Sequence, residues 1–295
     1  MTGAAAEPPT PPGAAGPADP PRPSVPLRPL KVHEVLALSV TRRRRGSGFW
    51  FGAAIAALWP FTMFGARVAF AGGEHVPRTG GALLACNHVS DVDPIYDVAF
   101  TISHGRMPRF LAKAELWRIP MVRNVMAGGG HIPVQRASIR AADAYKEAIE
   151  ALRRGEVVVF YPEGTFTADP AGWPMKAKNG IGRIALATGA PVIPVANWGT
   201  QELLPADRRP RFFPRKTVQI VAGPPVDLSS WLGGPRTRTA LDGATGAIMA
   251  DITALVAGLR GEDPPAVPYD PQVAAVKAAA VPAAASPEPA DPAAS

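Results

Sequence analysis

Short apolar runs alternate with helical patterns along the middle of the chain. The clearest runs, residues 81–86, 157–161 and 192–195, are continuously apolar or aromatic, which is typical of strands buried on both faces. Between them, apolar residues recur at three- and four-residue steps and predict helices, one of which ends at Gly155. Such alternation predicts an α/β fold, a single layered domain with a largely parallel or mixed sheet flanked by helices.

The two ends of the chain differ from its middle in composition. Residues 1–30 hold ten prolines among alanine and glycine, and residues 263–295 are again rich in proline and alanine. Neither segment can bury enough apolar surface to offset its ordering entropy, so we expect two disordered tails. This leaves a basic and apolar segment at residues 31–70 and a folded domain at residues 71–262.

Charge in the segment 31–70 indicates a membrane. The chain carries a net charge of +7, and the run Arg42–Arg45 directly precedes residues 49–66, which hold no formal charge and begin with Phe-Trp-Phe. A basic cluster beside an aromatic-rich apolar segment favours contact with an anionic membrane surface. A nucleic-acid partner is not expected, because the arginines adjoin an apolar segment instead of aromatics interleaved on a folded face.

Whether residues 49–66 cross the bilayer is a separate question. Their length is at the low end for a spanning helix, and Pro60 interrupts them. A span with the arginines inside would also place the folded domain outside the cell. We therefore expect an interfacial or re-entrant segment at the cytoplasmic face of the cell membrane, with a short span or a buried core helix as the alternatives.

Two polar islands follow apolar strands. The first, Asn87-His88-Val89-Ser90-Asp91-Val92-Asp93-Pro94, holds an imidazole and a carboxylate five positions apart, and the second, residues 161–165, reads Tyr-Pro-Glu-Gly-Thr. Five residues are about 140° round an ideal helix, so His88 and Asp93 can meet only if the chain turns between them. We expect Ser90 to cap a helix that begins near Asp91, which leaves Asp91 as a competing partner for His88.

Four sequence blocks in this order resemble the glycerolipid acyltransferase family (PlsC-like). They are His88 with Asp93, residues 130–136 (Gly-His-Ile-Pro-Val-Gln-Arg), residues 161–165 and residues 192–195 (Val-Ile-Pro-Val). The resemblance implies that His88 is a catalytic general base and that Asp93 orients its ring. It implies substrate-binding roles for Arg136, Glu163, Gly164, Thr165 and Lys178. The family's arginine after the Gly-Thr pair is Phe166 here, and Lys176, Lys178 or Arg183 could replace it.

The expected reaction is acyl transfer in phospholipid biosynthesis. A fatty acyl group would move from acyl-CoA or acyl carrier protein (acyl-ACP) to the free hydroxyl of the lysophospholipid 1-acylglycerol-3-phosphate, giving phosphatidic acid. No cofactor and no metal are expected. Two alternatives stay open: another acceptor such as glycerol 3-phosphate, a different lysophospholipid or a glycolipid, and a non-catalytic lipid-binding protein with the same fold.

Other chemistries lack their sequence patterns. The five histidines have no metal-ligand spacing, the chain contains no Gly-x-Ser-x-Gly sequence, and Gly128–Gly130 are not followed by the lysine of a phosphate loop. The single cysteine, Cys86, cannot form an intrachain disulfide. Its place in an apolar strand favours a core position over a nucleophilic role.

Overall fold

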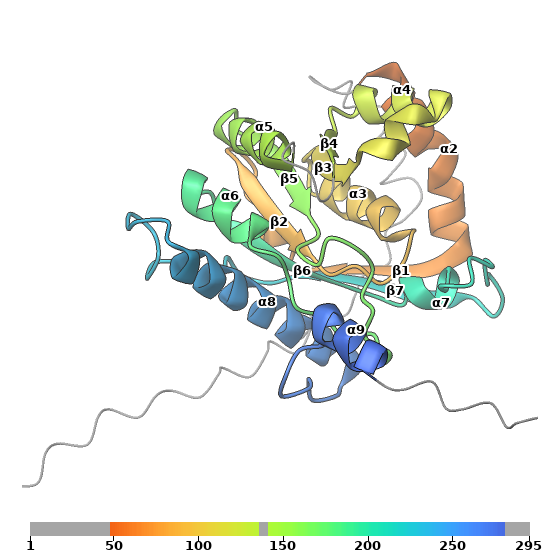
Figure 1. The fold of residues 1–295 in the computed structure, drawn as a ribbon. Coiled ribbons are helices and arrows are strands. Elements are labelled where there is room, and N and C mark those ends of the chain that lie inside the picture. Colours follow the sequence, from red (N-terminus) through yellow and green to blue (C-terminus); the bar gives the residue numbers. More distant parts are fainter. Residues whose placement is uncertain (1–47, 136–140, 281–295) are drawn as a thin grey trace, which may run out of the picture.

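A seven-stranded mixed sheet forms the centre of the computed structural model, which describes residues 48–135 and 141–280 (Figure 1). Its strand order is β1-β7-β6-β2-β5-β3-β4, and all neighbouring strands are parallel except β6 and β7. The strands are β1 (Ala66–Ala71), β2 (Ala82–Cys86), β3 (Pro108–Lys113), β4 (Ile132–Val134), β5 (Val157–Phe160), β6 (Val192–Trp198) and β7 (Lys216–Ala222).

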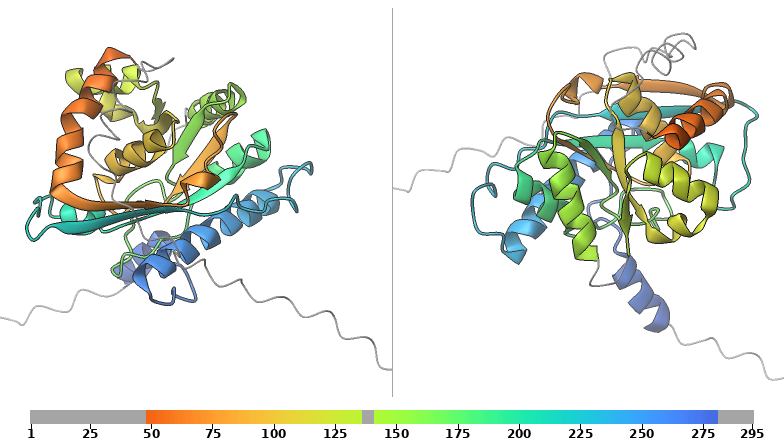
Figure 2. Two further views of the ribbon diagram at one scale, coloured as in Figure 1. Left: turned by 180° about the vertical axis from the view of Figure 1, so that it is seen from behind. Right: turned by 90° about the horizontal axis from the view of Figure 1, so that it is seen from above.

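Helices cover both faces of this sheet (Figure 2). Helices α5, α6 and α8 pack on one face, and α2 and α3 pack on the other, with α4 against α2. The helices are α2 (Phe49–Gly65), α3 (Asp93–Ser103), α4 (Pro120–Gly128), α5 (Ala141–Arg153), α6 (Gly180–Thr188), α7 (Thr200–Leu203), α8 (Arg238–Arg260) and α9 (Pro271–Ala280). The layered α/β domain expected from the sequence is confirmed.

The central strands are apolar throughout because each of their faces meets a helix layer. In β2, Leu84 packs with the α3 side and Leu83 with the α5–α6–α8 side, and both are fully buried. In β5, Val159 and Val158 divide in the same way. Successive side chains of a strand point to opposite faces, so a strand between two helix layers needs an apolar residue at every position.

The folded domain begins earlier and extends later than its sequence boundaries. Residues 66–70, expected in the segment 31–70, belong to the edge strand β1, which pairs with β7. Residues 271–280, expected in the disordered tail 263–295, form α9. The ion pair between Lys176 and Asp270, 2.9 Å long, connects the approach to α9 to the domain. The tail at residues 1–30 and the arginine run 42–45 lie outside the described residues.

Helix α2 continues through Pro60, although this residue was expected to interrupt the segment. One face of α2 is buried against the domain through Phe51 and Trp59, while Phe49 is 80% exposed and Trp50 48%. Among the described helices, only α8 has the length and composition to cross a membrane. Its apolar side packs along β6, which is the position of a core helix.

Candidate functional site

His88 and Asp93 meet at the carboxyl end of β2. The Nδ1–H of His88 donates to Oδ2 of Asp93 over 2.9 Å, and Asp93 is fully buried. The His88 side chain keeps 13% of its surface exposed and lines a pocket. This geometry fixes the ring tautomer and leaves Nε2 as the nitrogen available to a bound molecule. The sequence expectation that the chain turns between these two residues is confirmed.

The carboxylate of Asp93 also makes the turn itself. Its Oδ2 accepts hydrogen bonds from the backbone amides of Val89 (2.7 Å) and Ser90 (2.8 Å), and its Oδ1 accepts one from the hydroxyl of Thr200. Four donors therefore surround one buried carboxylate. The hydrogen-bonding capacity of the Asp93 carboxylate is therefore satisfied without contact with water.

Ser90 and Asp91 have different roles from those expected. Helix α3 begins at Asp93, and the Ser90 hydroxyl donates to the carbonyl of Leu204 (2.8 Å) instead of capping a helix at Asp91. Asp91 lines the pocket but pairs with Arg208 at 3.1 Å. Asp93 and not Asp91 is therefore the hydrogen-bond partner of His88. Its position in the first turn of α3 directs its carboxylate back toward the preceding loop.

Two aromatic rings hold the imidazole of His88. The Tyr161 ring stacks on it with 4.2 Å between centroids, and the Phe166 ring lies tilted 4.3 Å away. Phe166 stands where the family resemblance leads one to expect an arginine. It therefore contributes an apolar contact to the His88 ring at a position where a cation was expected.

A buried polar cluster lies behind this ring stack. The Tyr161 hydroxyl donates to Oδ2 of Asp97 over 2.5 Å, and the Asn197 amide donates to the same oxygen over 3.3 Å. Burial raises the pKa of the Asp97 carboxyl to about 8, although these hydrogen bonds act in the opposite direction. Burial also raises the pKa of the Cys86 thiol well above its ordinary value. Cys86 is fully buried in the core, which agrees with the structural role preferred for it.

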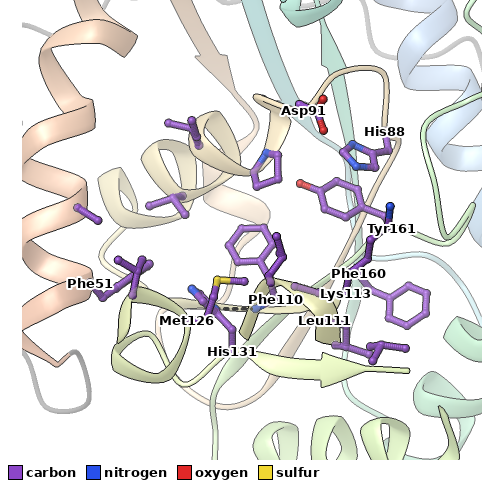
Figure 3. A pocket seen from close by; sticks show the side chains of 18 of the residues that line it. Phe51, His88, Asp91, Phe110, Leu111, Lys113, Met126, His131, Phe160 and Tyr161 are labelled. Atoms are coloured by element: carbon purple, nitrogen blue, oxygen red, sulfur yellow. Dashed lines mark hydrogen bonds between the residues drawn. The ribbon is translucent and has the colours of Figure 1, made fainter. Parts of the chain in front are cut away.

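His88 lies at one end of an apolar pocket of about 610 Å³ (Figure 3). Its walls come from α2, α3, β3, α4 and the end of β5. His88 and Tyr161 mark one end, while Phe51, Met126 and His131 lie at the other. A cavity of this size with few polar groups suits a ligand with a long apolar part.

His131 is a structural member of this pocket. Its Nδ1 accepts a hydrogen bond from the Phe110 amide over 3.1 Å, and Phe51 packs edge-on against its ring. Burial and the nearby Arg109 lower the pKa of His131 to about 4, so its ring is neutral at physiological pH. The block at residues 130–136 thus contributes a wall of the pocket. Its last residue, Arg136, a predicted substrate-binding residue, lies outside the described part of the chain.

The residues of the second polar island have different roles: one supports the loop that carries His88, one lines the pocket and one is exposed to solvent. Glu163 is 3% exposed, and its two oxygens accept from the amides of His88 (3.1 Å) and Met175 (3.0 Å). Burial raises the pKa of Glu163 to about 8 against the effect of these amides. Glu163 therefore holds the loop that carries His88. Gly164, with a φ of +74°, lines the pocket, whereas Thr165 is exposed and does not.

Three cations line the pocket. Lys178, a predicted substrate-binding residue, is one of them, and Lys113 and Arg208 are the others. Lys176 instead pairs with Asp270, and Arg183 lies exposed on α6 away from the pocket. Of the three cations offered as replacements for the missing arginine, only Lys178 reaches the pocket. Within the described ranges, no group of three histidine, cysteine or acidic residues could hold a metal ion.

Sequence reasoning missed the residues that support the site from a distance. Asn197 lies at the end of β6 and Thr200 at the start of α7. Each is a hundred or more residues from its partner in the chain. Arg208 lies in the following loop. Only Asp97 left a local signal, because it stands four residues after Asp93 and therefore on the same face of α3.

Comparison with known proteins identifies relatives of this site and fold. A family model described as Acyltransferase matches residues 67–198. The chain is 33% identical over 144 residues to the 1-acyl-sn-glycerol-3-phosphate acyltransferase of Borreliella burgdorferi, which covers 48% of this chain and 54% of the relative. It is 32% identical over 121 residues to the chloroplastic enzyme BAT2 of the same name from Brassica napus, covering 41% of this chain and 35% of the relative.

A solved structure agrees with these matches. The crystal structure of the 1-acyl-sn-glycerophosphate (LPA) acyltransferase PlsC from Thermotoga maritima is similar with a TM-score of 0.55 and 26% identity, over 78% of this chain and 89% of that one. The chain spans about a third to a half of the length of the two curated relatives above. The matched region contains His88, Asp93 and Glu163, and these similarities together support the PlsC-like acyltransferase family for this chain.

Proposed function

We propose that this protein is an O-acyltransferase that moves a fatty acyl group from a thioester donor, acyl-CoA or acyl-ACP, to the free hydroxyl of 1-acylglycerol-3-phosphate, giving phosphatidic acid. The observation that carries this proposal is the His88–Asp93 pair at the end of a 610 Å³ apolar pocket. The names of the relatives support the choice of acceptor.

In the proposed mechanism, His88 is the general base. Its Nε2 takes the proton of the acceptor hydroxyl while the hydroxyl oxygen attacks the thioester carbonyl. When the tetrahedral intermediate collapses, the carbon–sulfur bond breaks and the thiol leaves with the proton from Nε2. The buried charge of Asp93 stabilises the imidazolium that forms between these steps. No acyl-enzyme is needed, because both substrates are held beside one base.

The pocket supplies binding sites for both parts of such a lipid. Its apolar walls suit the acyl chain, whose burial contributes about 0.8 kcal/mol for each methylene. Lys113, Lys178 and Arg208 are the cations that line it. We assign the acceptor phosphate to Lys178, since Arg208 is already paired with Asp91 and the Lys178 amide donates to the carbonyl of Pro162, beside Glu163. Arg136 would be a further phosphate ligand from the block at residues 130–136.

A membrane-bound acceptor requires the protein to reach the membrane surface. Helix α2 lines the pocket with its inner side and exposes Phe49 and Trp50, which do not line the pocket. Aromatic side chains of this kind prefer the headgroup region of a bilayer. We therefore propose that α2 lies at the cytoplasmic face of the cell membrane, with the arginine run 42–45 beside anionic lipids.

A different acceptor is the second candidate, and Phe166 favours it. The ring of Phe166 takes the place of an expected cation and packs 4.3 Å from the His88 ring. An acceptor with a smaller charge near the reacting hydroxyl, such as a different lysophospholipid or a glycolipid, would fit this apolar contact better than a phosphate.

An acyl-transfer assay tests these proposals. Purified protein in detergent is given palmitoyl-CoA or palmitoyl-ACP with lysophosphatidate, other lysophospholipids or glycerol 3-phosphate, and both thiol release and lipid product are followed. His88→Ala should lower turnover by at least about 100-fold, the lower end of general-base catalysis. His75→Ala is the matched control, because His75 lies outside the pocket.

Each outcome has a distinct meaning. His88-dependent product from lysophosphatidate supports the main proposal, and product from another acceptor alone supports the second candidate. Turnover by a folded His88→Ala variant at near the original rate would refute the mechanism.

A further inference from the structure

The loop at residues 205–215, between α7 and β7, is unusually open to solvent. Every residue from Ala206 to Arg215 is exposed. Phe213 is 91% exposed and Phe212 41%, which makes Phe213 the most exposed large apolar side chain in the described part of the chain. Phe213 gains little from folding in this position, and together with Phe212 it leaves apolar surface available for a contact outside the domain.

Charge in this loop has one predominant sign. Four arginines, at positions 208, 209, 211 and 215, accompany a single acid, Asp207. Arg211 pairs with Asp207 at 3.0 Å on the surface, and Arg208 pairs with Asp91. With four arginines and one acid, the loop keeps a net positive charge, and its exposed ion pairs are weak enough to be exchanged for other partners. The loop thus combines an apolar tip with positive charge.

The loop contacts the carboxyl-terminal end of α2. Phe212 lies against Gly65, where an added Cβ would come within 3.2 Å of its ring, and Arg215 donates to the Ala66 carbonyl over 2.9 Å. Figure 1 shows the loop after α7 beside the end of α2 that leads into β1. The exposed face of α2 and the tip of the loop therefore lie at one side of the domain.

The same loop reaches the candidate site. Arg208, near its start, lines the pocket that ends at His88 and pairs with Asp91 in the loop after β2. A surface that received Phe213 would consequently lie close to the pocket. Because of this connection to the pocket, the loop differs from an exposed patch that lies far from the site.

We propose that residues 205–215 are a second membrane-docking element, which inserts Phe213 into the headgroup region of an anionic bilayer and sets its arginines against lipid phosphates. An aromatic side chain flanked by arginines matches such an interface, where the ring enters the apolar boundary and the guanidinium groups pair with phosphate. The inference extends the proposed function, because it rests on an acceptor that resides in a membrane. Docking through both α2 and this loop holds the pocket against the lipid layer.

A fluorescent label tests insertion directly. Cys86 is the single cysteine of the chain and is fully buried, so Phe213→Cys introduces an accessible thiol for a polarity-sensitive dye. Vesicles of phosphatidylcholine and phosphatidylglycerol in equal amounts should shift the dye emission to the blue, and spin-labelled lipid should quench it. Leu232→Cys is the matched control. Leu232 is 43% exposed and lies in the segment between β7 and α8, and Figure 1 shows that this segment extends on the side of the molecule away from α7.

Two double variants, each of which removes two arginine charges, test the electrostatic part of the proposed membrane contact. Arg209→Gln with Arg211→Gln should lower partitioning onto these vesicles by about 25-fold at low salt, roughly fivefold for each arginine at the surface. Binding to pure phosphatidylcholine vesicles should change little. Arg236→Gln with Arg238→Gln removes the same charge from exposed positions at the other end and should change binding less than twofold.

The outcomes decide the proposal. A dye at position 213 that stays in water while vesicles bind the protein would overturn it, as would equal losses from the two arginine pairs, which would indicate a net-charge effect alone. Insertion of residue 213 only on addition of a protein partner would also overturn it. None of these measurements uses the acyl-transfer reaction. Membrane docking by the loop can therefore be established or refuted even if the proposed acyl-transfer function fails.

Discussion

Replacement of Asp93 by asparagine separates the charge of this side chain from its role in the turn. The oxygen of asparagine can occupy the Oδ2 position, where it still accepts from the amides of Val89 and Ser90 and from His88. The amide nitrogen then faces the Thr200 hydroxyl, which can rotate to accept a hydrogen bond. The variant keeps the geometry of the loop and removes the negative charge.

The expected magnitude follows from the hydrogen bonds that lose their charge. A hydrogen bond to a charged partner contributes about 1.5 to 3 kcal/mol, and the bond from His88 joins two opposite charges only while the imidazolium exists. Asp93→Asn should therefore lower kcat by roughly 10- to 150-fold with little change in KM. Asp93→Ala is a poorer probe, because it leaves two backbone amides and a threonine hydroxyl without their acceptor.

Steady-state thiol release with lysophosphatidate as acceptor measures the effect, and thermal unfolding verifies that the variant is folded. Asp91→Asn is the matched control. Asp91 is only two residues away and lines the same pocket, but it pairs with Arg208 instead of His88, so its kcat should stay within a few-fold of the original. A folded Asp93→Asn variant with unchanged kcat would refute the assigned role, and so would a loss that appears wholly in KM.

Three further changes probe the surroundings of this pair. Burial raises the pKa of Asp97 from 3.8 to about 8, so the folded state binds this proton more tightly than the unfolded state, and the free energy of unfolding should fall as pH rises between these values. Glu163 acts in the same direction, so Asp97→Asn should roughly halve the slope seen in urea denaturation at pH 5 to 8; an unchanged slope would contradict the argument. Tyr161→Phe removes a hydrogen bond to a buried carboxyl and should cost about 1 to 3 kcal/mol of stability in the same assay, while the ring stack keeps kcat within a few-fold; unchanged stability would show that the bond contributes nothing. Lys178→Gln should raise the KM for lysophosphatidate about 10-fold at constant kcat, whereas an unchanged KM would assign the phosphate to other residues.

The sheet and the catalytic pair were predictable because their signals are local. Continuous apolar runs locate β2, β5 and β6, since strands between two helix layers need an apolar residue at each position. The spacing of His88 and Asp93 required a turn between them, and the family resemblance favoured Asp93 over Asp91 as the partner. Both arguments use residues close together in the chain.

The edges of the domain and the support of the site were not predictable in this way. Strand β1 is short, and its apolar residues continue the apolar character of α2, so the sequence offers no boundary between them. Glu163 was expected to bind substrate, yet it accepts two backbone amides whose positions depend on the folded loop. The fit of Thr200 to Asp93 requires β6 to end beside α3, which is a property of the whole sheet.

The long separation between Asp93 and Thr200 has a consequence for how the protein acquires activity. His88 and Asp93 are neighbours in the chain, but the contacts that hold them span 107 residues to Thr200 and 75 to Glu163, while Asn87 bonds Asn197 across 110. Closing such loops is the slow step for a sheet with distant strand partners. A nascent chain that has emerged only as far as β5 therefore holds both catalytic residues without an active site. Catalytic competence should appear together with global folding, as a single cooperative event.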